Sequence, residues 1–120
     1  MDRLIDALLA LSPKVRYVAV LRGNELLLRE RPGLAGASAS ETDRYEELLV
    51  NPTVLTLLHR RGEIDCGGLD HVWIRYGNFW TGLFRIADGH VNVGLEPDAV
   101  PTELVDRIRA VLERLAVPAR

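Results

Sequence analysis

Three short segments in the second half of the chain are rich in β-forming residues and are separated by turn-forming dipeptides. The segments are residues 69–76, 79–87 and 90–95, and the dipeptides are Gly77-Asn78 and Asp88-Gly89. Both dipeptides readily supply the positive φ angles of two-residue hairpin turns. The pattern therefore predicts three consecutive antiparallel strands.

The register of these strands follows if both turns contain two residues. Ile74 then lies opposite Thr81, and Ile86 lies opposite Val91. One face of the meander is nearly all apolar and is expected to face the core. Its residues are His71, Trp73, Trp80, Gly82, Phe84, Ile86, Val91, Val93 and Leu95. The other face is polar at one end, so we expect a helix, a partner chain or both to cover part of it.

The first part of the chain predicts a helix followed by a hairpin. Residues 2–11 carry a leucine-rich stripe at helical spacing, and Ser12-Pro13 ends the helix. Residues 15–21 and 25–31 are β-rich and flank Gly23-Asn24, a third hairpin dipeptide. In that hairpin one face is predicted to hold Tyr17, Ala19, Leu21, Leu26 and Leu28.

The middle of the chain predicts a loop over residues 32–39 and then helices. Ser40 is a suitable N-cap for a helix over residues 41–50. Proline costs about 3 kcal/mol inside a helix but little at its first position. Asn51-Pro52 therefore predicts a second helix, Pro52 to Arg61, with Asn51 as its N-cap.

Gly62 is then expected to be the left-handed C-cap of that second helix, and residues 63–68 a loop. After the meander, a last helix is expected from about Pro101 to Leu115. Its apolar stripe is Leu104, Val105, Ile108, Val111, Leu112 and Leu115.

The predicted order is α-β-β-α-β-β-β-α, a single α+β domain over residues 1–120. Five antiparallel strands are expected in one sheet, with helices on both faces. The net charge of −2 gives no reason to expect nucleic acid. No apolar run has the length of a membrane span, and Asp2 and Asp6 do not suit a signal peptide. We therefore expect a cytoplasmic protein.

Candidate chemistry is sparse. No phosphate-binding glycine motif is present, and the only cysteine is Cys66. Cys66, Asp70, His71 and His90 are possible members of a metal or thiol site, but their spacing does not support one, and a surface-loop cysteine is favoured. We expect no catalytic residue, no cofactor and no metal.

Aromatic residues gather around one predicted hairpin: Trp73, Tyr76, Phe79 and Trp80. They are possible elements of a ligand platform. Core packing with some interface is the favoured interpretation, because aromatic residues are enriched in both.

The element order resembles the roadblock family of dynein-light-chain-like domains, which have profilin-like and longin-like folds. The resemblance lies in the leucine-rich first helix running into VRYVAVLRGNELLLRER, the mid-chain helix, and the meander LDHVWIRYGNFWTGLFRIADGHVNVGL. It implies a non-enzymatic homodimer that binds and modulates a small Ras-like GTPase or serves as a scaffold. In that family one unbroken helix commonly pairs with its twin, whereas here Asn51-Pro52 divides the segment.

A partner surface is expected on the mid-chain helices. If residues 41–61 cover the sheet, their outer side would present Arg44, Glu47, Arg60 and Arg61, flanked by Tyr45 and Leu48. Arginine and tyrosine carry much of the binding energy at interfaces. We therefore expect five of these residues, Arg44, Tyr45, Leu48, Arg60 and Arg61, to contact the GTPase. The alternative function is a small-molecule sensor of profilin-like or PAS-like type, with a cavity beside Trp73 and Trp80.

Overall fold

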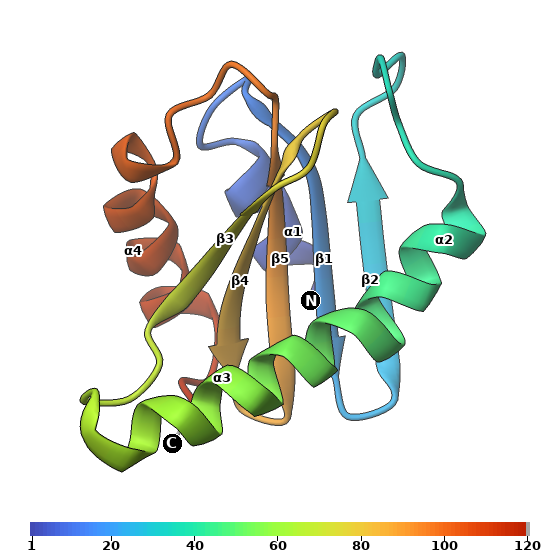
Figure 1. Cartoon of the computed structure of the whole chain (residues 1–120). Helices are drawn as coiled ribbons and strands as arrows, with labels where there is room; N and C mark the ends of the chain where they lie inside the picture. Colours follow the sequence, from blue (N-terminus) through green and yellow to red (C-terminus); the bar gives the residue numbers. More distant parts are fainter. Residues whose placement is uncertain (120) are drawn as a thin grey trace.

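A five-stranded antiparallel sheet forms the centre of the computed structural model, which describes residues 1–119 (Figure 1). The strands are β1 (Val15–Arg22), β2 (Glu25–Glu30), β3 (His71–Arg75), β4 (Trp80–Ile86) and β5 (Gly89–Leu95). Their spatial order is β2-β1-β5-β4-β3. The two hairpin units therefore join through β1 and β5 at the middle of the sheet.

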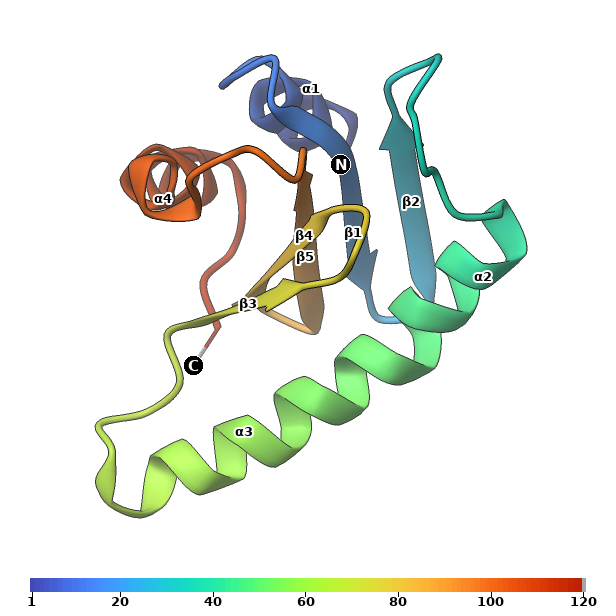
Figure 2. The ribbon, with the colours of Figure 1, turned by 45° about the horizontal axis from the view of Figure 1, so that its top comes forward.

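Helices cover both faces of this sheet (Figures 1 and 2). One face carries α1 (Asp2–Leu9) and α4 (Val105–Leu115), the latter preceded by a short 3-10 turn, η2 (Pro101–Glu103). The other face carries α2 (Ser40–Tyr45), a π-helical turn, η1 (Glu46–Val50), and α3 (Asn51–Asp65). The predicted α+β class and element order are confirmed. Within residues 1–119 no helix has both the length and the apolar character needed to cross a membrane.

The apolar face of the meander faces the core, as predicted, and the structure packs it under α1 and α4. Val91, Val93 and Leu95 are fully buried there and join one hydrophobic cluster with residues of both helices. Trp73 and Trp80 pack against the same cluster. The aromatic hairpin therefore contributes to the core on the α1–α4 side of the sheet.

Two of the three predicted hairpin registers are confirmed. Ile74 pairs with Thr81 across Gly77-Asn78, and Leu21 pairs with Leu26 across Gly23-Asn24.

The register predicted across Asp88-Gly89 is wrong by two residues. Ile86 pairs with Gly89, not Val91, because the turn residues are Ala87 and Asp88 and the positive φ falls on Asp88, at 61°. A shift of two residues leaves every side chain on its predicted face. Gly89 is not a turn residue. It allows the backbone to pack closely against β1, since a Cβ there would lie 1.7 Å from the Leu21 carbonyl oxygen.

The predicted division of the mid-chain helix at Asn51-Pro52 is wrong. Asn51 has helical angles, φ −65° and ψ −43°, and makes no cap, so α2, η1 and α3 run on without a break. A proline ring would collide with the carbonyl four residues before it in a regular α-helix. The π-helical turn directly before Pro52 widens the helix there, with the Asn51 N–H donating to the Glu46 carbonyl five residues back.

The predicted end of this helix at Arg61 is also wrong, since α3 continues to Asp65. Gly62 lies inside the helix, where a Cβ would be 2.9 Å from the backbone of Gly68 and Leu69. The glycine at this position lets the following loop fold back on the helix. The left-handed residues are Gly67 and Gly68, with φ of 79° and 88°.

Replacing Gly89 by alanine is expected to destabilise the protein strongly, because the new Cβ would meet backbone that cannot move without breaking the β1–β5 pairing. We expect a loss of at least about 2 kcal/mol in the free energy of unfolding. Gly77→Ala is the matched control, since a Cβ at Gly77 meets nothing within 4 Å. Urea titrations that gave both variants equal stability would contradict this assignment.

Candidate functional site

A buried carboxylate, Glu47, joins the mid-chain helix to the sheet. Its side chain is 1% exposed. One oxygen accepts hydrogen bonds from the Tyr17 hydroxyl and the Asn92 amide, both at 2.8 Å. The other oxygen lies 2.9 Å from the Asn51 amide nitrogen and 2.8 Å from His90 Nε2. Four polar side chains from three elements therefore satisfy a single buried charge.

The fold brings these residues together through two simple periodicities. His90 and Asn92 lie two apart on β5 and so point to the same face. Tyr17 is on the neighbouring strand β1 and points the same way. Asn51 follows Glu47 by four residues, which places both on the inner side of the helix.

The same hydrogen bonds keep Glu47 ionised. Burial by itself would raise the pKa of this carboxyl, but the bonds from His90, Tyr17 and Asn51 outweigh burial and lower the pKa. The pKa of Tyr17 is raised by its own burial and by the Glu47 charge, so its hydroxyl remains a donor. The network thus holds one negative charge in the interior.

Two further acids lie on the same stretch of helix. Burial and the charges of Glu47 and Asp43 raise the pKa of Glu46 to about 7. Burial also raises the pKa of Asp43, against the opposing effect of a 2.6 Å hydrogen bond from the Ser38 hydroxyl. Three carboxyl groups are therefore gathered where the helix meets the sheet.

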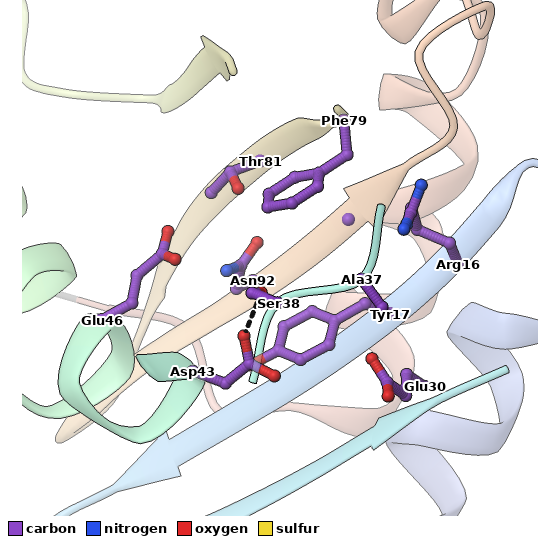
Figure 3. A pocket seen from close by; sticks show the side chains of 11 residues that line it. Arg16, Tyr17, Glu30, Ala37, Ser38, Asp43, Glu46, Phe79, Thr81 and Asn92 are labelled. Carbon is purple, nitrogen blue, oxygen red and sulfur yellow. Dashed lines mark hydrogen bonds between the residues drawn. The ribbon is translucent and has the colours of Figure 1, made fainter. Parts of the chain in front are cut away.

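A small cavity of about 20 Å³ adjoins this group of acids (Figure 3). The sheet forms its floor, the helix one wall, and the loop over residues 31–39 another. Its lining residues are Arg16, Tyr17, Glu30, Ala37, Ser38, Asp43, Glu46, Phe79, Thr81, Asn92 and Gly94. It has room for roughly one water molecule.

The five residues predicted to bind a partner are all exposed on the mid-chain helix: Arg44, Tyr45, Leu48, Arg60 and Arg61. Arg61 pairs with Asp65 at 2.6 Å. Glu47, which was expected on the same outer surface, points inward. The expectation failed for Glu47 because hydrogen-bond partners on β1 and β5 make burial of its charge favourable.

Large apolar side chains also lie exposed along the same helix. Leu57 is 62% exposed and Ile64 is 74% exposed. The full set, called the outer apolar stripe below, is Tyr45, Leu48, Leu49, Leu57, Leu58 and Ile64. Figure 2 shows the last turns of α3 reaching past the edge of the sheet.

The structure does not bring the candidate metal or thiol residues together. His90 belongs to the Glu47 network, whereas His71 stacks on Phe84 on the other face, with a ring-centroid distance of 5.4 Å. Cys66 is exposed in the loop after α3. Within residues 1–119 no group of three His, Cys, Asp or Glu residues is arranged to hold a metal ion.

No family model and no curated protein matches the sequence. Solved structures do match. A Roadblock/LC7 domain from Streptomyces avermitilis superposes with a TM-score of 0.68 at 14% identity, over 96% of this chain and 93% of that one. The protein therefore has the roadblock fold.

Two MglB structures share that fold with this chain. "MglB with tetrameric arrangement" gives a TM-score of 0.72 at 8% identity, over 95% of this chain and 83% of that one. The gliding protein MglB from Thermus thermophilus gives 0.66 at 12% identity, over 96% and 87%. These likenesses confirm the roadblock resemblance at the level of the fold.

The Glu47 network was not predicted from the sequence, although one signal for it is present. Asp43, Glu47 and Asn51 recur every four residues, in line with the buried Leu55. Such a polar stripe in register with an apolar position indicates an inward face. Tyr17, His90 and Asn92 supply the complementary polar group on the sheet.

The raised pKa of Glu46 predicts a pH-dependent gain in stability for Glu46→Gln. The pKa of Glu46 is about 7 in the folded protein and 4.5 in the unfolded chain. Between these two pH values the folded protein binds a proton that the unfolded chain has lost, so the free energy of unfolding falls as pH rises through that range. Glutamine imitates the protonated carboxyl. We expect the variant to match the parent near pH 5 and to exceed it by about 2 kcal/mol at pH 8, after discounting for partial exposure.

Urea titrations of both proteins at pH 5 and pH 8 measure this difference. Glu41→Gln is the matched control, because Glu41 is an exposed acid on α2. A gain for Glu46→Gln that did not change with pH would contradict the assigned pKa.

Proposed function

We propose that this protein is a non-enzymatic homodimeric interaction module that docks a small Ras-like GTPase. The observation that carries the proposal is the outer apolar stripe. Several large apolar side chains exposed on one helix are typical of a protein–protein contact surface. The roadblock fold agrees with this role, since the sequence resemblance implied the same class of protein.

A second copy of the chain is the proposed occupant of the outer apolar stripe. The helix runs unbroken from Ser40 to Asp65, so its outer side is one continuous surface despite Pro52. At 1.5 Å per residue it is about 39 Å long. Two such helices packed together would remove the exposed leucines from water, and stable interfaces bury about 800 Å² per partner.

The proposed GTPase contact consists of the arginines at the two ends of the stripe with their apolar neighbours. Arg44, Tyr45 and Leu48 lie at one end, and Arg60 and Arg61 lie near the other. About 25 Å of helix separates Arg44 from Arg61. Two copies crossing near the middle of the stripe would leave these ends free for a partner. Arg44 and Arg60 form no ion pair within residues 1–119, which leaves both guanidinium groups available.

The sensor alternative receives less support. Trp73 and Trp80 pack against the core on the α1–α4 side and do not line the cavity beside Glu46. That cavity is only about 20 Å³, and the larger hollows within residues 1–119, of about 290 to 330 Å³, are not lined by Trp73 or Trp80 either.

Leu49→Glu combined with Leu57→Glu is expected to convert a dimer to a monomer, because two charges would be buried at the centre of the helix contact. Sedimentation at tens of micromolar protein measures the oligomeric state, because a dimer with a Kd near 1 μM would be almost fully formed at that concentration. Val100→Glu is the matched control, since Val100 is 49% exposed and precedes η2 on the α4 side. A monomeric parent protein would contradict the homodimer.

Arg44→Glu combined with Arg61→Glu is expected to weaken binding of a Ras-like GTPase partner about 30-fold, the equivalent of 2 kcal/mol. Affinity is measured with the GTPase in its GDP-bound and GTP-bound states. The dimer and its melting temperature should be nearly unchanged.

The matched control for this charge reversal is Arg3→Glu combined with Arg114→Glu. Both residues are exposed on α1 and α4, which cover the opposite face of the sheet, and the change in net charge is the same. Equal weakening by both double variants would reduce the effect to long-range electrostatics. If the parent protein shows no nucleotide-dependent binding to the GTPase, the proposed GTPase partner is contradicted.

A further inference from the structure

We propose that residues 40–50, the first turns of the mid-chain helix, form a pH-sensitive latch that docks on the sheet when Glu46 is protonated and loosens when Glu46 ionises. The latch is a property of this chain alone and does not depend on the proposed GTPase contact. Arg44, Tyr45 and Leu48 lie on these turns, so a partner that binds them would meet an ordered surface only while the latch is closed.

The latch has no apolar anchor of its own. The buried side chains of α2 and η1 are Asp43 and Glu47, and both are acids. The leucines of these turns are exposed instead. In α3, by contrast, the apolar side chain of Leu55 is buried. Burial of apolar groups does not depend on pH, whereas contacts made by carboxyl groups change with protonation. Docking of the latch is therefore expected to respond to pH.

The segments at both ends of the latch allow it to open by itself. The loop over residues 31–39, which precedes it, contains turns but no helix or strand (Figure 1). At its other end Pro52 has no N–H, so one bond of the helix ladder is missing. A helical segment of this length is marginally stable in water without tertiary contacts. Opening of the latch therefore does not require the sheet to unfold.

Glu46 is the titrating group of the latch. Its Oε1 atom is inaccessible to solvent and accepts no hydrogen bond. The side chain of Asn51 contacts the Glu46 carboxyl, and its Oδ1 atom is also buried without a donor, since the amide nitrogen donates to Glu47. An ionised Glu46 carries no donor, whereas a protonated Glu46 carries one. The docked arrangement therefore favours the neutral acid.

Negative charge around Glu46 acts in the same direction. Asp43 and Glu47 flank it on the helix, and Glu30 of β2 lines the same cavity (Figure 3). Burial and the charges of Glu47 and Asp43 raise the pKa of Glu46 to about 7, from 4.5 in a solvated chain. The contribution of Glu46 to docking is therefore complete below pH 4.5 and is lost as pH rises through about 7.

The groups that face the latch from the sheet do not neutralise Glu46. The ionisable residues among them are Arg16, Tyr17, Glu30, Tyr76 and His90. Tyr17 and His90 hydrogen-bond Glu47. Arg16 is engaged by two backbone carbonyls and by the acid that follows β5. Within residues 1–119 no basic side chain forms an ion pair with Glu46.

Amide hydrogen exchange measured by mass spectrometry tests the latch. Protection factors, from which the intrinsic effect of pH on exchange has been removed, are compared at pH 6 and pH 8. We expect lower protection in residues 41–50 than in β5 at both pH values, because the latch opens without global unfolding. Protection of residues 41–50 should fall about threefold to tenfold from pH 6 to pH 8, the upper limit being set by pKa values of about 7 in the closed latch and 4.5 in the open one.

Glu46→Gln and Glu47→Gln should have opposite effects, although the two residues are adjacent. Glutamine imitates protonated Glu46, so protection of residues 41–50 should rise at pH 8 and lose most of its pH dependence. Glu47→Gln should lower that protection at least about tenfold, because the buried carboxylate of Glu47 is hydrogen-bonded by four side chains. Glu41→Gln is the matched control, since Glu41 is an exposed acid of α2, and it should keep the pH dependence of the parent.

Three results would overturn the proposal. They are residues 41–50 protected as strongly as β5, protection that does not change between pH 6 and pH 8, and a pH dependence that persists in Glu46→Gln. The last result would assign the effect to another group, such as His90, which that variant leaves unchanged. Protection of β5 shows that each variant is folded. Because the measurement needs no partner protein, failure here leaves the GTPase proposal standing, and failure to bind a GTPase leaves the latch standing.

Discussion

The hydrogen-bonded carboxylate of Glu47 is the interaction on which the arrangement of the helix against the sheet depends. Burying a charge is unfavourable unless its partners are in place, and removing one member of a buried charged network typically costs about 3–5 kcal/mol. Tyr17, His90 and Asn92 supply those partners from β1 and β5, the two central strands. Apolar packing alone would allow the helix to slide, whereas these directed bonds define its position along the sheet.

The position of that anchor explains the shape of the rest of the helix. Glu47 lies in the first third of a segment that runs to Asp65, so α3 is held at one end and extends past the sheet at the other (Figure 2). The buried positions Asp43, Glu47, Asn51 and Leu55 are each four residues apart. That spacing drifts around a regular α-helix, and the π-helical turn reduces the drift while accommodating Pro52. The outer side of the helix carries the exposed residues of the outer apolar stripe.

The anchor also gathers negative charge in one place. Asp43 and Glu46 flank Glu47 on the same helix, and their pKa values are raised because burial and neighbouring charge disfavour ionisation. The pKa of Glu47 is lowered instead, because four side chains hydrogen-bond its carboxylate. The cavity lies beside Asp43 and Glu46.

The sequence by itself determined the strands, two of the three registers, the core face and the overall fold, because alternation and turn chemistry act over a few residues. Gly77-Asn78 and Gly23-Asn24 set their hairpins locally. At Asp88-Gly89 the turn falls one residue earlier, with the positive φ on Asp88, and Gly89 instead lies against the carbonyl of Leu21, a residue distant in sequence. Only the tertiary structure decided that Pro52 continues a helix and that Glu47 is buried. Burial of Glu47 depends on hydrogen bonds to β1 and β5, which are far from the mid-chain helix in the sequence. The four-residue spacing of Asp43, Glu47 and Asn51 indicates an inward face but does not identify those partners.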